Sequence, residues 1–239
     1  VISISVLLVL VIGPLRDPNR TSPQVLEPPG KEHLLGTDSL GRDVAARLIA
    51  AARFDLLIVA SSVLLAFGAG LIVGTILGFS HESVDFAGMR FLEIFQAIPA
   101  LLLGLLVLTA LGSGVFNLIG VIVLLNIPIY ARLVRAELLA KRRSPLVDAA
   151  RISGVSWPKT IILYVLPSSL TSALAYIPSQ AGFAVILVAG LGFLGLGVPL
   201  PQAELGDMIR QGTSDIMIGV WWTGLFPSLV LIGATLSFY

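Results

Sequence analysis

The sequence predicts an all-α, polytopic membrane protein with six transmembrane helices. Of its 239 residues, 56% are hydrophobic and only 12% are charged, whereas a soluble domain carries about 25% charged residues. The charges are clustered, which leaves uncharged tracts at residues 1–15, 56–81, 94–131, 160–203 and 216–239. A bilayer core about 30 Å thick needs about 20 apolar residues as helix, and backbone groups in lipid must be hydrogen-bonded internally. The tracts therefore predict membrane helices.

The first two crossings are predicted near the start of the chain. Residues 1–15 are interpreted as the truncated end of a first membrane helix. The apolar region of a signal peptide is the alternative, but it requires a small-residue cleavage site, and the tract instead ends in residues 13–17, Gly-Pro-Leu-Arg-Asp. Residues 56–79 predict the second crossing.

The two longest tracts must be divided. Residues 94–131 are too long for one crossing and contain a turn composition at residues 111–114. The tract at 160–203 holds one crossing followed by a glycine-rich segment at residues 190–197. The remaining four crossings are predicted at residues 91–110, 115–131, 170–190 and 216–238.

Glycines and prolines mark the predicted crossings. Gly70, Gly74 and Gly78 recur every fourth residue and share one helix face. Glycine lets backbones approach closely in lipid, so this spacing predicts contact with a neighbouring helix; the general glycine enrichment of membrane helices is the alternative. Kinks are expected where proline interrupts a crossing, at Pro99, Pro128 and Pro178.

Six crossings place both chain ends on one side of the membrane. Lysine and arginine are almost evenly divided between the two sides, so the positive-inside rule favours a cytoplasmic position for the basic loop at residues 132–159 only through its density of charge. The predicted organisation is a first helix and periplasmic segment at residues 1–55, followed by a transmembrane domain at residues 56–239.

Composition excludes several kinds of site. The net charge of +1 indicates no polyanion, so no nucleic-acid partner is expected. The absence of cysteine excludes disulfides and thiolate chemistry. His33 and His81 stand without a second ligand at metal-site spacing, so no metal is expected. The pair Gly30-Lys31 is followed by glutamate and therefore forms no phosphate-binding loop.

Residues 144–167 carry the most informative pattern. Ser144 is suited to cap a helix that has Pro145 at its first position, and Asp148 complements the dipole in the first turn. Gly154 is a natural helix stop, and Ser156 can cap a second helix. A short helix projecting from a membrane protein is suited to a groove on another protein.

These residues resemble a known family. Asp148-Ala149-Ala150, then Gly154 and Leu166-Pro167, resemble the coupling loop of ABC importer permeases. The resemblance implies that residues 132–167 form a cytoplasmic coupling loop, whose helix contacts an ATP-binding subunit. The implied coupling residues are Asp148, Ala149, Ala150, Arg151, Gly154, Leu166 and Pro167.

Further motifs narrow the resemblance to the "C"-type permease subunits of dipeptide, oligopeptide and nickel importers. It covers residues 34–239 in order, although Asp148 replaces the usual glutamate, and Tyr164, Ser168, Val188 and Leu205 also depart from the family pattern. The motifs are Leu35-Gly36-Thr37-Asp38, Gly41-Arg42-Asp43, Ile98-Pro99-Ala100-Leu101, Tyr130-Ala131-Arg132-Leu133-Val134-Arg135, Phe193-Leu194-Gly195-Leu196-Gly197 and Gly206-x-Met208.

The resemblance implies a type I ABC importer permease fold in a prokaryotic inner membrane. Its expected partners are a homologous second permease, two ATP-binding domains (separate or fused) and an extracytoplasmic substrate-binding protein. The chain itself is expected to bind no cofactor and to catalyse no reaction, because ATP and magnesium belong to the ATPase subunits. Di- or oligopeptides are the expected cargo; nickel or other metal chelates, glutathione and opines are the alternatives.

The translocation path is weakly marked. Gln96, Asn126 and Gln180 are polar positions within crossings, and Glu93 lies near a helix end. Each is either a path residue or the partner in an interhelical hydrogen bond. A secondary transporter would require internal repeats and intramembrane charges, and an intramembrane enzyme would require a nucleophile and base at depth; the sequence shows neither set.

Overall fold

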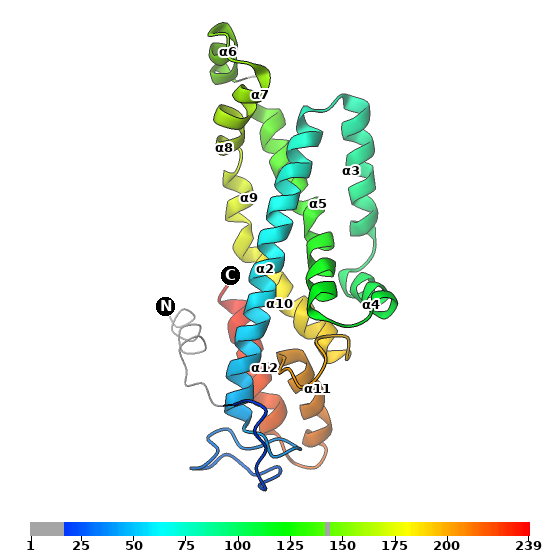
Figure 1. Ribbon diagram of the computed structural model, residues 1–239, viewed down its shortest axis with the longest axis vertical. Coiled ribbons are helices and arrows are strands. Elements are labelled where there is room, and N and C mark those ends of the chain that lie inside the picture. The colour runs from blue at the N-terminus through cyan, green and yellow to red at the C-terminus, as the bar shows by residue number, and fades with distance from the viewer. Residues whose placement is uncertain (1–16, 142–143) are drawn as a thin grey trace. The chain divides into compact units, whose positions relative to one another are not determined.

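The computed structural model describes residues 17–141 and 144–239, and these residues form helices joined by turns and loops, without a β-strand (Figure 1). They fall into two compact units. The first unit contains the chain up to Ser61, with Leu101–Val121 and Ala181–Tyr239, and the second contains Ser62–Ala100 and Ile122–Gln180. The helices are α2 (Val44–Phe79), α3 (Glu82–Ala97), α4 (Ala100–Leu111), α5 (Val115–Lys141), α6 (Pro145–Ile152), α7 (Trp157–Thr160), the π-helix η1 (Ile161–Val165), α8 (Leu166–Ser168), α9 (Thr171–Ala175), α10 (Ile177–Phe193), α11 (Leu205–Ile216) and α12 (Trp222–Leu236).

In the second unit, the regularly spaced glycines of α2 lie against α5, as their spacing predicts. A Cβ at Gly70 would lie 2.4 Å from the Cβ of Tyr130, and one at Gly74 would lie 2.5 Å from the carbonyl oxygen of Ala131. Gly78 is less constrained, with Leu138 side-chain atoms at 3.4 Å. The backbones of α2 and α5 approach closely because these positions carry no side chain.

Polar contacts join α3 to α5 within the same unit. Arg135 donates two hydrogen bonds to the carboxylate of Asp85, and Arg132 donates to the side chain of Gln96 at 2.5 Å. Such forked arginine–carboxylate pairs are among the stronger polar contacts in proteins. These arginines belong to a segment that was predicted to be a loop from Arg132 onward. The structure shows that α5 continues as a helix as far as Lys141.

The predicted crossing at residues 91–110 is a broken pair of helices. Helix α3 ends at Ala97, and Ile98 adopts an extended conformation with φ −94° and ψ 130°. The residue before a proline is driven out of the helical region by the proline ring, so Pro99 separates α3 from α4 where only a kink was expected. The turn at residues 111–114 is confirmed, with positive φ at Gly112 and Gly114.

The last crossing also starts later than predicted. Residues 205–216 form α11, and the chain turns at Gly219, which has φ 85°. Helix α12 then begins at Trp222 and packs closely on α11, because a Cβ at Gly212 would lie 2.4 Å from the Cα of Gly224. The crossing predicted at 170–190 is likewise divided, into α9 and α10.

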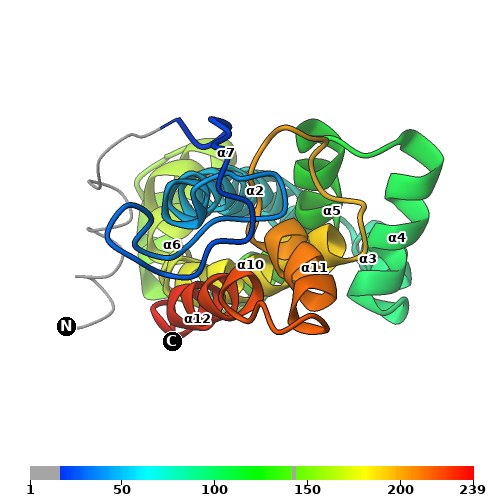
Figure 2. The same cartoon turned by 90° about the horizontal axis from the view of Figure 1, so that it is seen from below.

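An apolar core in the first unit joins the start of α2 to α11 and α12. Figure 2 shows the loop before α2 folded over the N-terminal end of that helix. The Trp222 indole donates to the carbonyl of Thr37 at 3.1 Å, which fixes this loop against α12. The core residues are Val44, Leu48, Ala51, Ala203, Leu205, Met208, Val220 and Trp222.

Two described helices, α2 and α5, are long and apolar enough to span a membrane, and the broken pair α3–α4 passes the same test as a third span. Helices α10 and α12 are apolar but shorter, with 17 and 15 residues. The tract at residues 1–15 lies outside the described residues.

Single cysteines test the topology, because the chain contains none of its own. Ser39 lies exposed in the loop before α2, and Ser144 lies just before α6. A membrane-impermeant thiol reagent added to intact cells is expected to label Ser39→Cys and to label Ser144→Cys only after the cells are opened. Labelling of both from outside would contradict the six-helix arrangement.

Candidate coupling segment and buried polar positions

Helix α6 begins where the sequence predicts. Pro145 is its first residue, where the missing N–H is not needed. The backbone N–H groups of Val147 and Asp148 donate to the carbonyl of Ser144 at 3.0 and 3.2 Å. Asp148 lies in the first turn, where a carboxylate is stabilised by the positive end of the helix dipole.

Gly154 ends this helix by adopting a left-handed conformation. Its φ is 74°, and the N–H of Val155 donates back to the carbonyl of Ala150 at 3.1 Å. This six-residue closure is the Schellman motif, in which glycine is favoured because it has no Cβ. A Cβ built on Gly154 would meet no atom within 4 Å, so the backbone conformation alone constrains this position.

The exposed face of α6 differs from the one expected. Asp148, Ala149 and Ile152 face outward, and Ile152 is 88% exposed. Ala150, which was expected to contact a partner, is only 8% exposed, because it faces inward with Val147 in a segment where α6 contacts α7 and η1. The outward surface therefore includes Asp148, Ala149 and Ile152; the side chain of Arg151 lies outside the described part of the structure.

The second helix of the segment begins after Ser156, as predicted, but changes its winding. The N–H of Thr160 donates to the carbonyl of Ser156 at 2.9 Å. Residues Ile161–Val165 form a π-helical turn, and the N–H of Leu166 reaches back five residues to Ile161. Pro167 follows, exposed, and has no N–H with which to continue the ladder. π-turns are rare and occur often at functional sites.

The three polar positions expected to line a path have different surroundings. Asn126 is fully buried and donates to the Ile122 carbonyl at 2.7 Å, but its side-chain oxygen has no partner. Gln180 is also buried, with its side-chain oxygen unpaired. Gln96 is exposed and bound by Arg132. The described contacts do not join the three side chains. Glu93 pairs with Arg90 at 2.9 Å at the helix surface.

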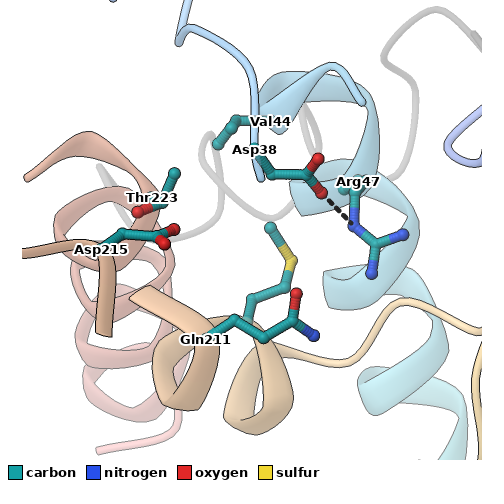
Figure 3. A pocket seen from close by; sticks show the side chains of 7 residues that line it. Asp38, Val44, Arg47, Gln211, Asp215 and Thr223 are labelled. Carbon is teal, nitrogen blue, oxygen red and sulfur yellow. Dashed lines mark ion pairs between the residues drawn. The ribbon is translucent and has the colours of Figure 1, made fainter. Parts of the chain in front are cut away.

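A charged cluster in the first unit explains the motif around residues 35–47. Asp38 accepts from Arg42 at 2.7 Å and lies 3.6 Å from Arg47, which is almost fully buried. Figure 3 shows Asp38 and Arg47 beside Gln211 and Asp215 in a small pocket. Buried charges need such partners, and the Asp38–Arg47 pair attaches the loop to the start of α2. Arg42 also donates to the side-chain oxygen of Gln211 in α11 at 3.5 Å.

Comparison with known proteins identifies the family. Residues 70–239 match the family described as binding-protein-dependent transport system inner membrane component. The chain belongs to this family. It is therefore a multi-pass inner-membrane permease component and not a catalytic subunit, and its predicted all-α polytopic fold is confirmed.

Relatives of this permease cover most of its length. It is 35% identical over 222 residues to the di/tripeptide transport system permease protein DppC of Pseudomonas aeruginosa, covering 93% of this chain and 73% of the relative. It is also 35% identical over 210 residues to a Brucella suis protein named as a peptide permease, covering 87% and 70% of the two chains. A chain from the crystal structure of an amino acid ABC transporter with histidines has the same fold, with a TM-score of 0.61 at 16% identity, covering 81% of the permease and 90% of that chain.

Sequence reasoning missed two buried carboxylates of the permease, Asp55 and Glu204. Both are in the first unit and both are nearly or fully buried. The available signal was the glycine-rich segment at residues 190–197, because glycine is often found where another group approaches the backbone closely. The sequence did not show that the approaching group is a carboxylate.

Proposed function

We propose that this permease subunit carries di- or oligopeptides across the inner membrane in an ATP-driven, binding-protein-dependent importer. The observation that carries the cargo assignment is the match, over most of the chain, to relatives that are themselves named as di/tripeptide and peptide permeases. Nickel chelates, glutathione and opines remain the alternative cargoes.

The proposed partners follow from the same family. They are a homologous second permease, two ATP-binding domains and an extracytoplasmic substrate-binding protein; ATP and magnesium are bound by the ATPase. We assign the contact with the ATPase to α6. Its exposed residues Asp148, Ala149 and Ile152 form a surface suited to a groove on a partner. Leu166 and Pro167 belong to α8, which follows the π-helix η1 directly.

Uptake by the reconstituted importer tests the cargo. The complete assembly is placed in liposomes together with its binding protein. Uptake of a labelled tripeptide is then compared between liposomes that have ATP on the side of the ATPase and liposomes that have ATP only on the opposite side. Unlabelled dipeptides and tripeptides are expected to compete, whereas glutathione, an opine and a nickel chelate are not. Competition by one of these alone would reassign the cargo and leave the permease assignment intact.

Purification of the tagged chain from its native membranes tests the partners. An ATPase carrying a phosphate-binding loop and a second permease are expected to co-purify in fixed ratio. Uptake of substrate by the chain alone, driven by an ion gradient and without any ATPase, would contradict the importer and favour a secondary transporter.

A further inference from the structure

The segment between α10 and α11 holds a fully buried carboxylate among glycines. Glu204 is 0% exposed, and its Oε2 atom accepts from the N–H of Val198 at 2.9 Å. A Cβ at Gly192 would lie 1.9 Å from Oε1, and a Cβ at Gly197 would lie 2.0 Å from Oε2. Any side chain at these two positions would therefore occupy the space of the carboxylate, and we call this space the Glu204 cradle.

A second buried carboxylate lies beside it. Asp55 of α2 is 4% exposed, and its Oδ2 atom accepts from the N–H of Leu205 at 3.1 Å, the residue that follows Glu204. Because Leu205 follows Glu204 directly in the chain, this hydrogen bond places the Asp55 carboxylate next to the residue that carries the second carboxylate. Asp55 thus binds the first residue of α11, and Glu204 binds the loop that precedes it.

Each carboxylate has one oxygen without a hydrogen-bond partner. These oxygens are Oδ1 of Asp55 and Oε1 of Glu204, and both are buried. No ion pair to either group is found among the described residues. Ionised carboxylates can only accept hydrogen bonds, so two buried, unpaired acceptors of like charge are unfavourable together. One added proton removes one of the two like charges and so relieves their mutual repulsion.

We propose that Asp55 and Glu204 form a proton-binding pair, and that the bound proton holds the start of α11 against α2. The charged groups facing Glu204 are Asp55 from α2 and Asp207 from α11, and Asp207 is itself bound by Arg210. Neither neighbouring carboxylate favours ionisation of Glu204. The proposal concerns the first unit only and does not depend on the cargo or on the coupling role of α6.

Burial gives the direction of the pH dependence. Desolvation, opposed by the Val198 hydrogen bond and reinforced by Asp207, raises the pKa of Glu204 from 4.5 to about 7. Between these values the folded state holds more protons than the unfolded state, so the free energy of unfolding falls as the pH rises through this window. Above it Glu204 is ionised in both states and its contribution no longer changes.

Thermal unfolding of the purified full-length complex at pH 5 to 8 tests the pair. The difference in unfolding midpoint between wild type and the double variant Asp55→Asn/Glu204→Gln is expected to shrink or reverse as the pH rises, because the amides cannot ionise. Glu32→Gln, at an exposed position of the same unit, is the matched control and is expected to follow wild type. A double variant that keeps the wild-type pH profile would overturn the proposal.

A second measurement does not require the double variant to fold. The infrared band of a protonated carboxyl is expected in the wild-type complex at pH 7 and is expected to weaken in Glu204→Gln or Asp55→Asn. Absence of that band in wild type would overturn the proposal. So would a rise in the wild-type unfolding midpoint at pH 8 on addition of sodium or calcium, which would show that the pair binds a metal cation instead of a proton.

Discussion

Uptake by the assembled importer is expected to be abolished, or nearly so, in the Gly154→Val variant. A β-branched residue strongly disfavours positive φ, and Gly154 has φ 74°. Forcing that conformation costs about 1–3 kcal/mol, which corresponds to a roughly 5- to 150-fold shift in an equilibrium. The Schellman closure between Val155 and Ala150 is expected to open, so α6 loses its fixed C-terminal end. The measurement is ATP hydrolysis and uptake side by side in liposomes.

Two further variants separate coupling from assembly. Gly154→Asn is the matched control, because asparagine tolerates the left-handed conformation and the space around Gly154 is open; its uptake is expected to approach wild type. Ala149→Trp enlarges the exposed face and is expected to loosen the ATPase without disturbing α6 itself. Normal coupled uptake by Gly154→Val would exclude this loop as the coupling element.

Ala149 is a better position for this enlargement than Ala150. The resemblance implies that both residues belong to the coupling segment, but Ala150 is buried within the permease. Ala150→Trp would therefore disturb the permease before it reached any partner. The motif predicts the helix correctly. A sequence motif does not show, however, which face of this eight-residue helix is buried against the rest of the permease.

Features of the fold could be predicted from the sequence where the interacting residues lie close together along the chain. The limits of α6 depend on Ser144, Pro145 and Gly154, whose preferences act within a few residues, and the structure confirms them. The α2 glycines repeat with the period of a helix face, so their contact was readable too. The coupling role itself stays a prediction, because it depends on a contact between α6 and a separate ATP-binding subunit.

Other features depend on residues far apart in the chain. Asp55 and Leu205 are 150 positions apart, and neither the pair of carboxylates nor its glycine surroundings could be assembled from local pattern. The break in the crossing predicted at residues 91–110 and the late start of the last crossing have local causes that composition conceals. Uncharged tracts show where the chain avoids water, whereas Pro99, Gly219 and the π-turn before Pro167 decide where a helix stops or changes its winding.

The Gly74→Ala variant is expected to destabilise the permease by about 1–3 kcal/mol, the usual cost of overpacking a close-packed site. Its Cβ would lie 2.5 Å from the Ala131 carbonyl oxygen and 3.0 Å from the Ala131 Cα. These are backbone atoms of α5, which cannot move aside as a flexible side chain can. The measurement is the unfolding midpoint of the purified complex, together with the amount of full-length chain in the membrane.

Gly68→Ala is the matched control, because it makes the same chemical change six residues earlier on α2. A Cβ at Gly68 would meet no atom within 4 Å, and alanine favours a helix over glycine by about 1 kcal/mol. Gly68→Ala is therefore expected to be neutral or slightly stabilising. A steric clash depends on the atoms that face each position, so it would make the two substitutions differ. Equal effects would therefore show that the glycines serve the flexibility of α2 and not its close approach to α5.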